Sequence, residues 1–195
     1  MKTLNLLVFL LFCGTLEAQN LLENPDFDTD LSGWTLTGPV APVWDPFDVD
    51  ASPASGSALI TNAEADAESD IEVLSQCIIT GADRYVWAVK AFIPSGQART
   101  GSVVLRYSYQ ANTFDCSGGF VSGGGVLITN LDAWTDSNGN PVTISPEQVG
   151  TGGSMKLSIA LRKTEAGGTF TAYVDSAVLH GDAFLKDSFE QSPSR

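Results

Sequence analysis

The segment from residue 102 to residue 110 carries the side chains whose types and spacing best suit ligand chemistry. Its residues alternate, so that Leu105 and Tyr107 share one face of an expected strand and Arg106 and Gln110 share the other. Planar polar side chains such as arginine and the amides form hydrogen bonds in a fixed geometry, which suits the hydroxyl groups of a sugar. The pattern is typical of a polar strand face that binds a glycan, and equally of an ordinary solvated strand face.

Two aromatic side chains are candidates for stacking on the apolar faces of sugar rings. Trp44 lies in the proline-flanked segment 42–47, where no strand is expected, and a loop aromatic beside polar residues suits a ligand better than a buried one. Tyr173 alternates away from Val174, so we expect it to be exposed, either as a ligand platform or as a rim residue of a sheet. Trp87 shares its face with apolar neighbours and is expected in the core.

A carboxylate within an apolar strand is a further signal. Asp175 is flanked by Val174 and Val178, and burying a carboxylate is costly unless it is paired, hydrogen-bonded or ligated. Calcium binds carboxylate and carbonyl oxygens at flexible geometry, which makes a metal site one interpretation. The other interpretation is that Asp175 accepts hydrogen bonds from backbone N–H groups at a turn.

The residues give little support for catalysis. His180 is the only histidine and follows the last expected strand, and no G-x-S-x-G nucleophile motif occurs. Two carboxylates can act as the acid and base of a glycosidase, but in so acidic a chain many carboxylates pair by chance. We therefore expect no enzyme, and a glycoside hydrolase is the third of three candidate functions.

The first residues have the features of a secretion signal. Lys2 precedes an apolar run over residues 4–12 that is too short to span a bilayer, and cleavage is expected after Ala18. Residues 1–18 are thus the expected signal peptide, and the protein is expected in the extracellular space or the periplasm. Acylation of Cys13, as in a lipoprotein, is the alternative.

The rest of the chain is expected to form one domain over 19–181 and a tail over 182–195. With 23 acidic and 10 basic residues the net charge is −13, which repels nucleic acid and anionic lipid and suits neutral ligands and divalent cations. No second apolar stretch is long enough to cross a membrane. Cys77 and Cys116 remain after processing, and an oxidising compartment predicts a disulfide between them.

Strand signals are frequent after the signal, whereas no segment keeps apolar residues at helical spacing for three turns. Glycine-rich segments, including 118–119 and 123–125, indicate turns or bulges between the strands. The pattern predicts an all-β fold, a sandwich or jelly roll of two antiparallel sheets. The expected strands are 57–61, 70–80, 84–92, 102–110, 126–131, 155–161 and 169–179.

The two ends of the expected domain carry a family resemblance. The opening reads Asn24-Pro25-Asp26-Phe27-Asp28 and then Leu31-Ser32-Gly33-Trp34, and the closing strand over 172–179 contains an aspartate. This pattern resembles the carbohydrate-binding modules of families four, nine and twenty-two, which are galactose-binding-like. The resemblance implies a β-jelly roll whose first and last segments lie side by side, with Trp34 as a packing residue.

The resemblance also implies where the sites lie. Such modules usually hold a structural calcium where the first and last strands meet, and the motif carries this over to Asp26, Ser57 and Asp175. Their ligand groove crosses the concave face of one sheet, and the order Arg106, Gln110, Asn112 is similar to the arginine-and-amide pattern of one groove strand.

The resulting expectation is a secreted, non-catalytic module that binds a polysaccharide or another glycan through Trp44, Arg106, Gln110, Asn112 and Tyr173. A calcium-stabilised adhesion or protein-interaction module of the cell surface is the alternative. Residues 39–53 and 112–125 have no counterpart in the resembled families, so the glycan is not specified. The oligomeric state is not specified either.

Overall fold

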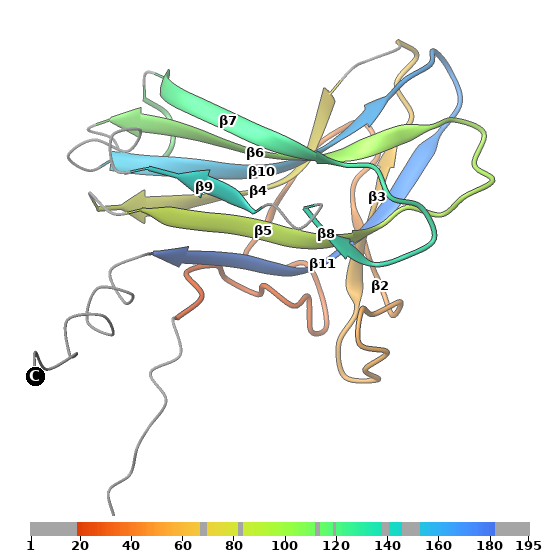
Figure 1. Ribbon diagram of the computed structural model, residues 1–195, viewed down its shortest axis with the longest axis horizontal. Helices are drawn as coiled ribbons and strands as arrows, with labels where there is room; N and C mark the ends of the chain where they lie inside the picture. The colour runs from red at the N-terminus through yellow and green to blue at the C-terminus, as the bar shows by residue number, and fades with distance from the viewer. Residues whose placement is uncertain are drawn as a thin grey trace, which may run out of the picture.

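The computed structural model describes residues 19–66, 70–81, 84–111, 114–118, 120–137, 141–145 and 153–181. Over these ranges the chain forms strands and loops without a helix, and two antiparallel sheets pack face to face (Figure 1). The predicted all-β sandwich is confirmed. The expected signal at 1–18, Asn112 and the expected tail at 182–195 lie outside the described residues.

Each sheet has one long strand at its centre. In order across it, the first sheet consists of β1 (Thr35–Leu36), β4 (Asp70–Thr80), β10 (Gly153–Lys163), β6 (Gly101–Ala111) and β7 (Phe120–Ile128). The second sheet consists of β2 (Val43–Asp45), β3 (Ser57–Asn62), β11 (Phe170–Gly181) and β5 (Tyr85–Phe92), with β8 (Thr135–Asp136) and β9 (Val142–Ile144) both paired to β5.

The core lies between the sheets and follows the predicted alternation. In β10, Leu157, Ile159 and Leu161 are fully buried, and in β6, Val103 and Leu105 are as well. Because side chains of a strand alternate between its two faces, one apolar set per strand is enough to fill the space between the sheets. Leu105 and Tyr107 share the buried face of β6, and Trp87 lies in the core, as predicted.

The glycine-rich segment 123–125 lies inside β7, so its prediction as a turn is wrong. A Cβ atom at Gly125 would lie only 2.1 Å from the carbonyl oxygen of Leu105, so β7 requires glycine where β6 approaches it. The strand expected over 126–131 ends at Ile128. The strands β1, β2, β8 and β9 were not expected, because two or three residues are too few to show alternation.

The beginning of the described chain lies beside its end, as predicted. The backbone N–H of Leu21 donates to the carbonyl oxygen of Leu179 at 2.9 Å, and that of Ala177 donates to Pro25 at 2.8 Å. Trp34 is buried and donates its indole N–H to the carbonyl oxygen of Asn24 at 3.1 Å. The opening motif is therefore fixed against β11 by packing and by backbone hydrogen bonds.

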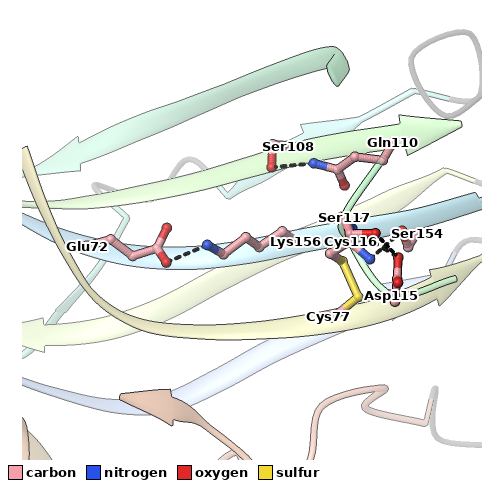
Figure 2. The surroundings of a disulfide bond; sticks show 9 residues. All are labelled: Glu72, Cys77, Ser108, Gln110, Asp115, Cys116, Ser117, Ser154 and Lys156. Carbon is pink, nitrogen blue, oxygen red and sulfur yellow. Dashed lines mark hydrogen bonds and ion pairs between the residues drawn. A yellow bond between two sulfur atoms is a disulfide. The ribbon is translucent and has the colours of Figure 1, made fainter. Parts of the chain in front are cut away.

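The predicted disulfide between Cys77 and Cys116 is confirmed, with a Cα–Cα distance of 5.9 Å (Figure 2). Cys77 lies in β4, whereas Cys116 lies in the segment that joins β6 to β7. The N–H of Cys116 also donates to Ser154 Oγ on β10 at 3.0 Å. Together these contacts hold residues 114–118 across the outer face of the first sheet, the face that points away from the second sheet.

Candidate functional site

A groove of about 620 Å³ lies on the outer face of the first sheet. Side chains of β4, β10 and β6 line it, and β7 borders it along the sheet edge. Its polar lining includes Arg106, Ser108, Ser158 and Arg162. A second cavity of about 480 Å³ shares Leu127 and Arg162 with the groove, so the hollow continues along the strands. The site is therefore elongated, as a chain-like ligand requires.

The strand register explains why the groove is open. Arg106 pairs with Ser158 of β10 on one side and with Gly125 of β7 on the other. Ser108 pairs in the same way with Gly123. Directly paired residues place their side chains on the same face of a sheet, so glycine backbone lines the groove beside the polar side chains of β6. The Phe120 ring lies close to Gly123, where a Cβ atom would be 2.9 Å from it. The glycine-rich sequence thus shapes the groove rather than a turn.

A charged network forms the floor of the groove. Asp70 is half-buried and accepts two hydrogen bonds from Arg162, at 2.5 Å from Nε and 2.8 Å from the terminal nitrogen. Arg106 forms an ion pair with the same carboxylate. Burial and the charge of Arg162 lower the pKa of Arg106 from its ordinary value. Two guanidinium groups therefore share one aspartate.

Phe120 provides an aromatic surface at the groove. Its side chain lines the groove and is 70% exposed. An exposed ring beside hydrogen-bond donors is the combination that stacks on a sugar ring and binds its hydroxyl groups. Phe120, Asp70 and Arg162 were not among the site residues predicted from the sequence. The only signal for Phe120 was an aromatic residue directly before a glycine-rich segment.

The three residues predicted for the groove strand have different outcomes. Arg106 lines the groove, as expected. Gln110 points to the same face, but it is buried and its amide lies 3.1 Å from Ser108 Oγ (Figure 2). The disulfide-bonded segment covers this end of the sheet, which leaves Gln110 outside the groove lining. Asn112 lies outside the described residues.

Trp44 and Tyr173 belong to the second sheet, so the five predicted residues do not form one site. Trp44 lies in β2 rather than in a loop, and its indole N–H donates to the carbonyl oxygen of Phe27 at 2.7 Å. Its ring packs on the backbone at Gly56, where a Cβ atom would lie 2.7 Å from the ring. These contacts indicate a packing role for Trp44.

Tyr173 belongs to a cluster of four aromatic rings on the outer face of the second sheet. Phe47 is its centre, with ring centroids 4.9 Å from Tyr173, 5.0 Å from Phe92 and 5.3 Å from Trp134. Phe47 belongs to the loop between β2 and β3. The cluster therefore fixes this loop on the sheet.

The carboxylate predicted as a calcium ligand is buried beside that loop. Asp175 is 1% exposed and accepts hydrogen bonds from the backbone N–H groups of Val49, at 3.0 Å, and Ser176, at 2.6 Å. Burial raises its pKa to about 6, against the effect of these hydrogen bonds, and the charges of Asp48 and Asp26 add to the increase. A β-bulge follows Asp175, with Ser176 at a φ of 46°.

The three proposed ligands, Asp26, Ser57 and Asp175, lie on three separate segments. The charge of Asp26 acts on Asp175, and burial together with Asp28, Asp48 and Asp50 raises the pKa of Asp26 itself. Ser57 is fully buried, and its hydroxyl has no hydrogen-bond partner among the described residues.

The carboxylate and hydroxyl oxygens of these residues, and the repulsion between the carboxylates, suit a hard cation. In the described ranges, however, no three histidine, cysteine, aspartate or glutamate side chains are arranged to hold a metal. Calcium would therefore need hydroxyl and carbonyl oxygens as well.

His180, the only histidine, lies away from the groove, with Nδ1 3.3 Å from the carbonyl oxygen of Gln19. Glu72, the carboxylate in the groove lining, is paired with Lys156 at 2.5 Å (Figure 2), and Asp70 is paired with the groove residues Arg106 and Arg162. A glycosidase needs one carboxyl group that donates a proton to the leaving group. Neither of these two is free to do so.

Comparison with known proteins gives a match in structure only. No family model and no curated protein matches the sequence. The module TmCBM61, solved in complex with β-1,4-galactotriose, is 20% identical with a TM-score of 0.54, and the match covers 84% of this chain and 99% of that one. The xylan-binding domain CBM22-1 of Paenibacillus barcinonensis Xyn10C is 16% identical with a TM-score of 0.56, over 84% and 95% of the two chains. The fold is shared with carbohydrate-binding modules.

The same fold occurs within larger proteins. The enzymatically active domain of tailspike protein 4 of bacteriophage CBA120 is 12% identical with a TM-score of 0.59, and the match covers 83% of this chain but only 21% of that one. The resemblance to carbohydrate-binding modules is thus confirmed for the jelly-roll fold. In the part of the chain that is described, no helix is long and apolar enough to cross a membrane.

Proposed function

We propose that this protein is a secreted, non-catalytic module that binds a glycan in the groove of the first sheet. The observation that carries the proposal is the exposed ring of Phe120 in one elongated groove with Arg106. The ring offers an apolar face for the C–H face of a sugar, and the guanidinium offers hydrogen-bond donors for its oxygens. The solved carbohydrate-binding modules of the same fold support this function.

The polar side chains of the groove suit a chain of sugars. Ser108 and Ser158 add hydroxyl groups beside Arg106, and Gly123 and Gly125 let the ligand approach the strand backbone. The hollow continues past Arg162 into the second cavity, which gives room for more than one sugar ring. The carboxylates of Asp70 and Glu72 are both held in ion pairs, which supports binding without hydrolysis.

A glycan array with the purified protein tests the proposal. We expect saturable binding that falls at least tenfold in Phe120→Ala and in Arg106→Ala. Phe114→Ala is the matched control, because Phe114 is 69% exposed and does not line the groove. Loss of binding in the control alone, or binding that neither groove variant weakens, would contradict the groove as the site.

The array also separates the other candidate functions. A complete absence of glycan binding, with specific capture of a cell-surface protein, would favour the adhesion module. Release of reducing sugar from a polysaccharide would favour the hydrolase. Secretion rests on the expected signal at residues 1–18 and on the disulfide. Detection of the processed protein outside the cytoplasm would test it.

We further propose that calcium stabilises the join of the first and last segments. Asp175 and Asp26 would supply carboxylate oxygens, and the unpartnered hydroxyl of Ser57 would supply another. A bound cation would remove the repulsion among the carboxylates, so we expect a chelator to lower the melting temperature. The variant Asp175→Asn should lose this sensitivity. An unchanged melting temperature in chelator would remove calcium from the proposal.

A further inference from the structure

Three of the seven basic residues in the described ranges lie on the face that carries the groove. The chain has 23 acidic and only 10 basic residues. Three basic residues, Arg106, Lys156 and Arg162, project from the outer face of the first sheet. The basic residues of the described ranges are Arg84, Lys90, Arg99, Arg106, Lys156, Arg162 and Lys163. The face that carries the groove therefore differs in charge from the protein as a whole.

The ion pairs on this face leave one positive charge without a carboxylate of its own. Lys156 is paired with Glu72 at 2.5 Å. Arg162 occupies both oxygens of Asp70, at 2.5 and 2.8 Å. Arg106 forms an ion pair with the same carboxylate through a terminal nitrogen. Because a guanidinium has five N–H donors, most of those on Arg106 are available to a ligand.

The surroundings of Arg106 favour an anion over a neutral group. The side chain is 38% exposed and lines the groove. Its neighbours in the register are Ser158 and Gly125, neither of which carries a charge. The guanidinium of Arg162 repels it, and Glu72, which also lines the groove, is paired with Lys156 at 2.5 Å. Asp115, on the disulfide-bonded segment, is hydrogen-bonded to Ser117 and does not line the groove (Figure 2).

We propose that the glycan bound in this groove is an acidic one, and that Arg106 binds the carboxylate of a uronic acid residue. This inference rests on the proposed glycan-binding function and names its ligand class. A carboxylate matches the planar guanidinium in a two-point contact, which a neutral hydroxyl group does not. Arg162 keeps Asp70 while Arg106 turns to the ligand, so no carboxylate of the protein is left unpaired. Phe120 stacks on a sugar ring of the same chain.

The net charge of the protein makes ionic strength a poor test. A charge of −13 repels a polyanion at long range, while the contact at Arg106 attracts its carboxylate. Added salt screens both effects, over a Debye length of about 8 Å at physiological ionic strength. The carboxyl group itself must therefore be changed while the sugar backbone stays the same.

The test measures binding of polygalacturonate, alginate, glucuronoxylan and hyaluronan, each before and after reduction of its carboxyl groups to primary alcohols. Isothermal titration calorimetry with the full mature chain provides the affinity. We expect at least one native polysaccharide to bind and its reduced form to bind about 10- to 100-fold more weakly, as the loss of a charged hydrogen-bonded contact predicts. Arg106→Gln should weaken binding of the native polysaccharide by a similar factor and binding of the reduced one by a smaller factor, because only the native form loses a charged contact.

Lys90→Gln is the matched control. It removes the same charge from the protein, but Lys90 lies in β5 of the second sheet and does not line the groove. Equal effects of the two variants would show a general charge effect and overturn the assignment of Arg106. Equal binding of native and reduced polysaccharide, or binding of neutral glycans only, would overturn the acidic ligand but leave the proposed function standing. Failure to bind any glycan would overturn both.

Discussion

A buried lysine offers a sharp test of how the sandwich is held together. Lys163 is the last residue of β10, and its side chain is fully buried. Its ammonium group donates to the carbonyl oxygens of Glu64, of Gly168 at 3.1 Å and of Gly167 at 3.3 Å. It thereby joins the segment after β3 to the turn between β10 and β11. A carbonyl oxygen that loses its donor in a buried place costs free energy, so this one side chain should matter for stability.

The substitution Lys163→Met keeps the length of the side chain and removes its donors. The carbonyl oxygen of Gly167 retains a second donor, Arg99 Nε at 3.0 Å, so two carbonyl oxygens lose their partner. Hydrogen bonds from a charged donor contribute about 1.5–3 kcal/mol each, and removing the desolvation cost of a buried ammonium offsets part of the loss. We expect the free energy of unfolding to fall by about 3 kcal/mol.

Urea unfolding followed by tryptophan fluorescence measures this change. With an m-value of about 2 kcal/mol per molar, the midpoint should fall by roughly 1.5 M. Lys156→Met is the control in the same strand, because Lys156 is half-exposed and its ion pair with Glu72 should contribute less than about 1 kcal/mol. If Lys163→Met costs no more than Lys156→Met, the ammonium does not hold the two segments together and the reasoning is wrong.

Three further predictions concern other parts of the fold. Replacing Cys77 and Cys116 by serine should lower the free energy of unfolding by about 4 kcal/mol, as loop entropy over 39 residues predicts, and a urea titration without reductant would measure this. Gly125→Ala should lower the free energy of unfolding by about 1–3 kcal/mol, because its Cβ would lie 2.1 Å from a backbone oxygen. Gly124→Ala should lower it less, because its Cβ would lie 3.0 Å from the Tyr107 ring. Equal melting temperatures of the two variants would contradict this. The pKa of Asp175 is about 6 in the folded state and lower in the unfolded state, so the unfolded chain binds fewer protons between about pH 4 and 6. In the presence of a chelator, the free energy of unfolding should therefore fall as the pH rises through this window. Asp175→Asn should remove this pH dependence.

The long strands were predictable because one of their faces is buried. In β5, exposure alternates along the whole strand, with Trp87 and Val89 in the core and Lys90 outside. Burial of one face imposes the period of two on the sequence, so the sequence shows the strand. The same logic found β6 and β10. The disulfide was predictable because Cys77 and Cys116 were the two cysteines that remained after the expected signal.

The composition of the groove was not predictable in the same way. Asp70 and Arg162 are 92 residues apart, and only the pairing of β4 with β10 brings them together. No local pattern in either strand carries that information. Phe120 begins a strand whose glycines resemble a turn, because a strand that leaves space for a ligand lacks the side chains that make strands recognisable. The glycines of β7 that line the groove therefore also make this edge strand difficult to recognise in the sequence.

The outer faces of the two sheets have different roles, which explains why Trp44 and Tyr173, the aromatic residues predicted for the ligand site, lie away from the groove. On the second sheet, Tyr173 and Phe47 fix the loop whose Val49 N–H binds Asp175, so the aromatic rings there support the buried carboxylate. On the first sheet, Phe120 lies exposed beside Arg106. Trp44 and Tyr173 satisfied the sequence criteria for a residue that stacks on a ligand, although both of them pack against other parts of the protein. What distinguishes the two cases is whether the ring is packed within the protein or exposed, and Phe120 is an exposed ring in a groove lining.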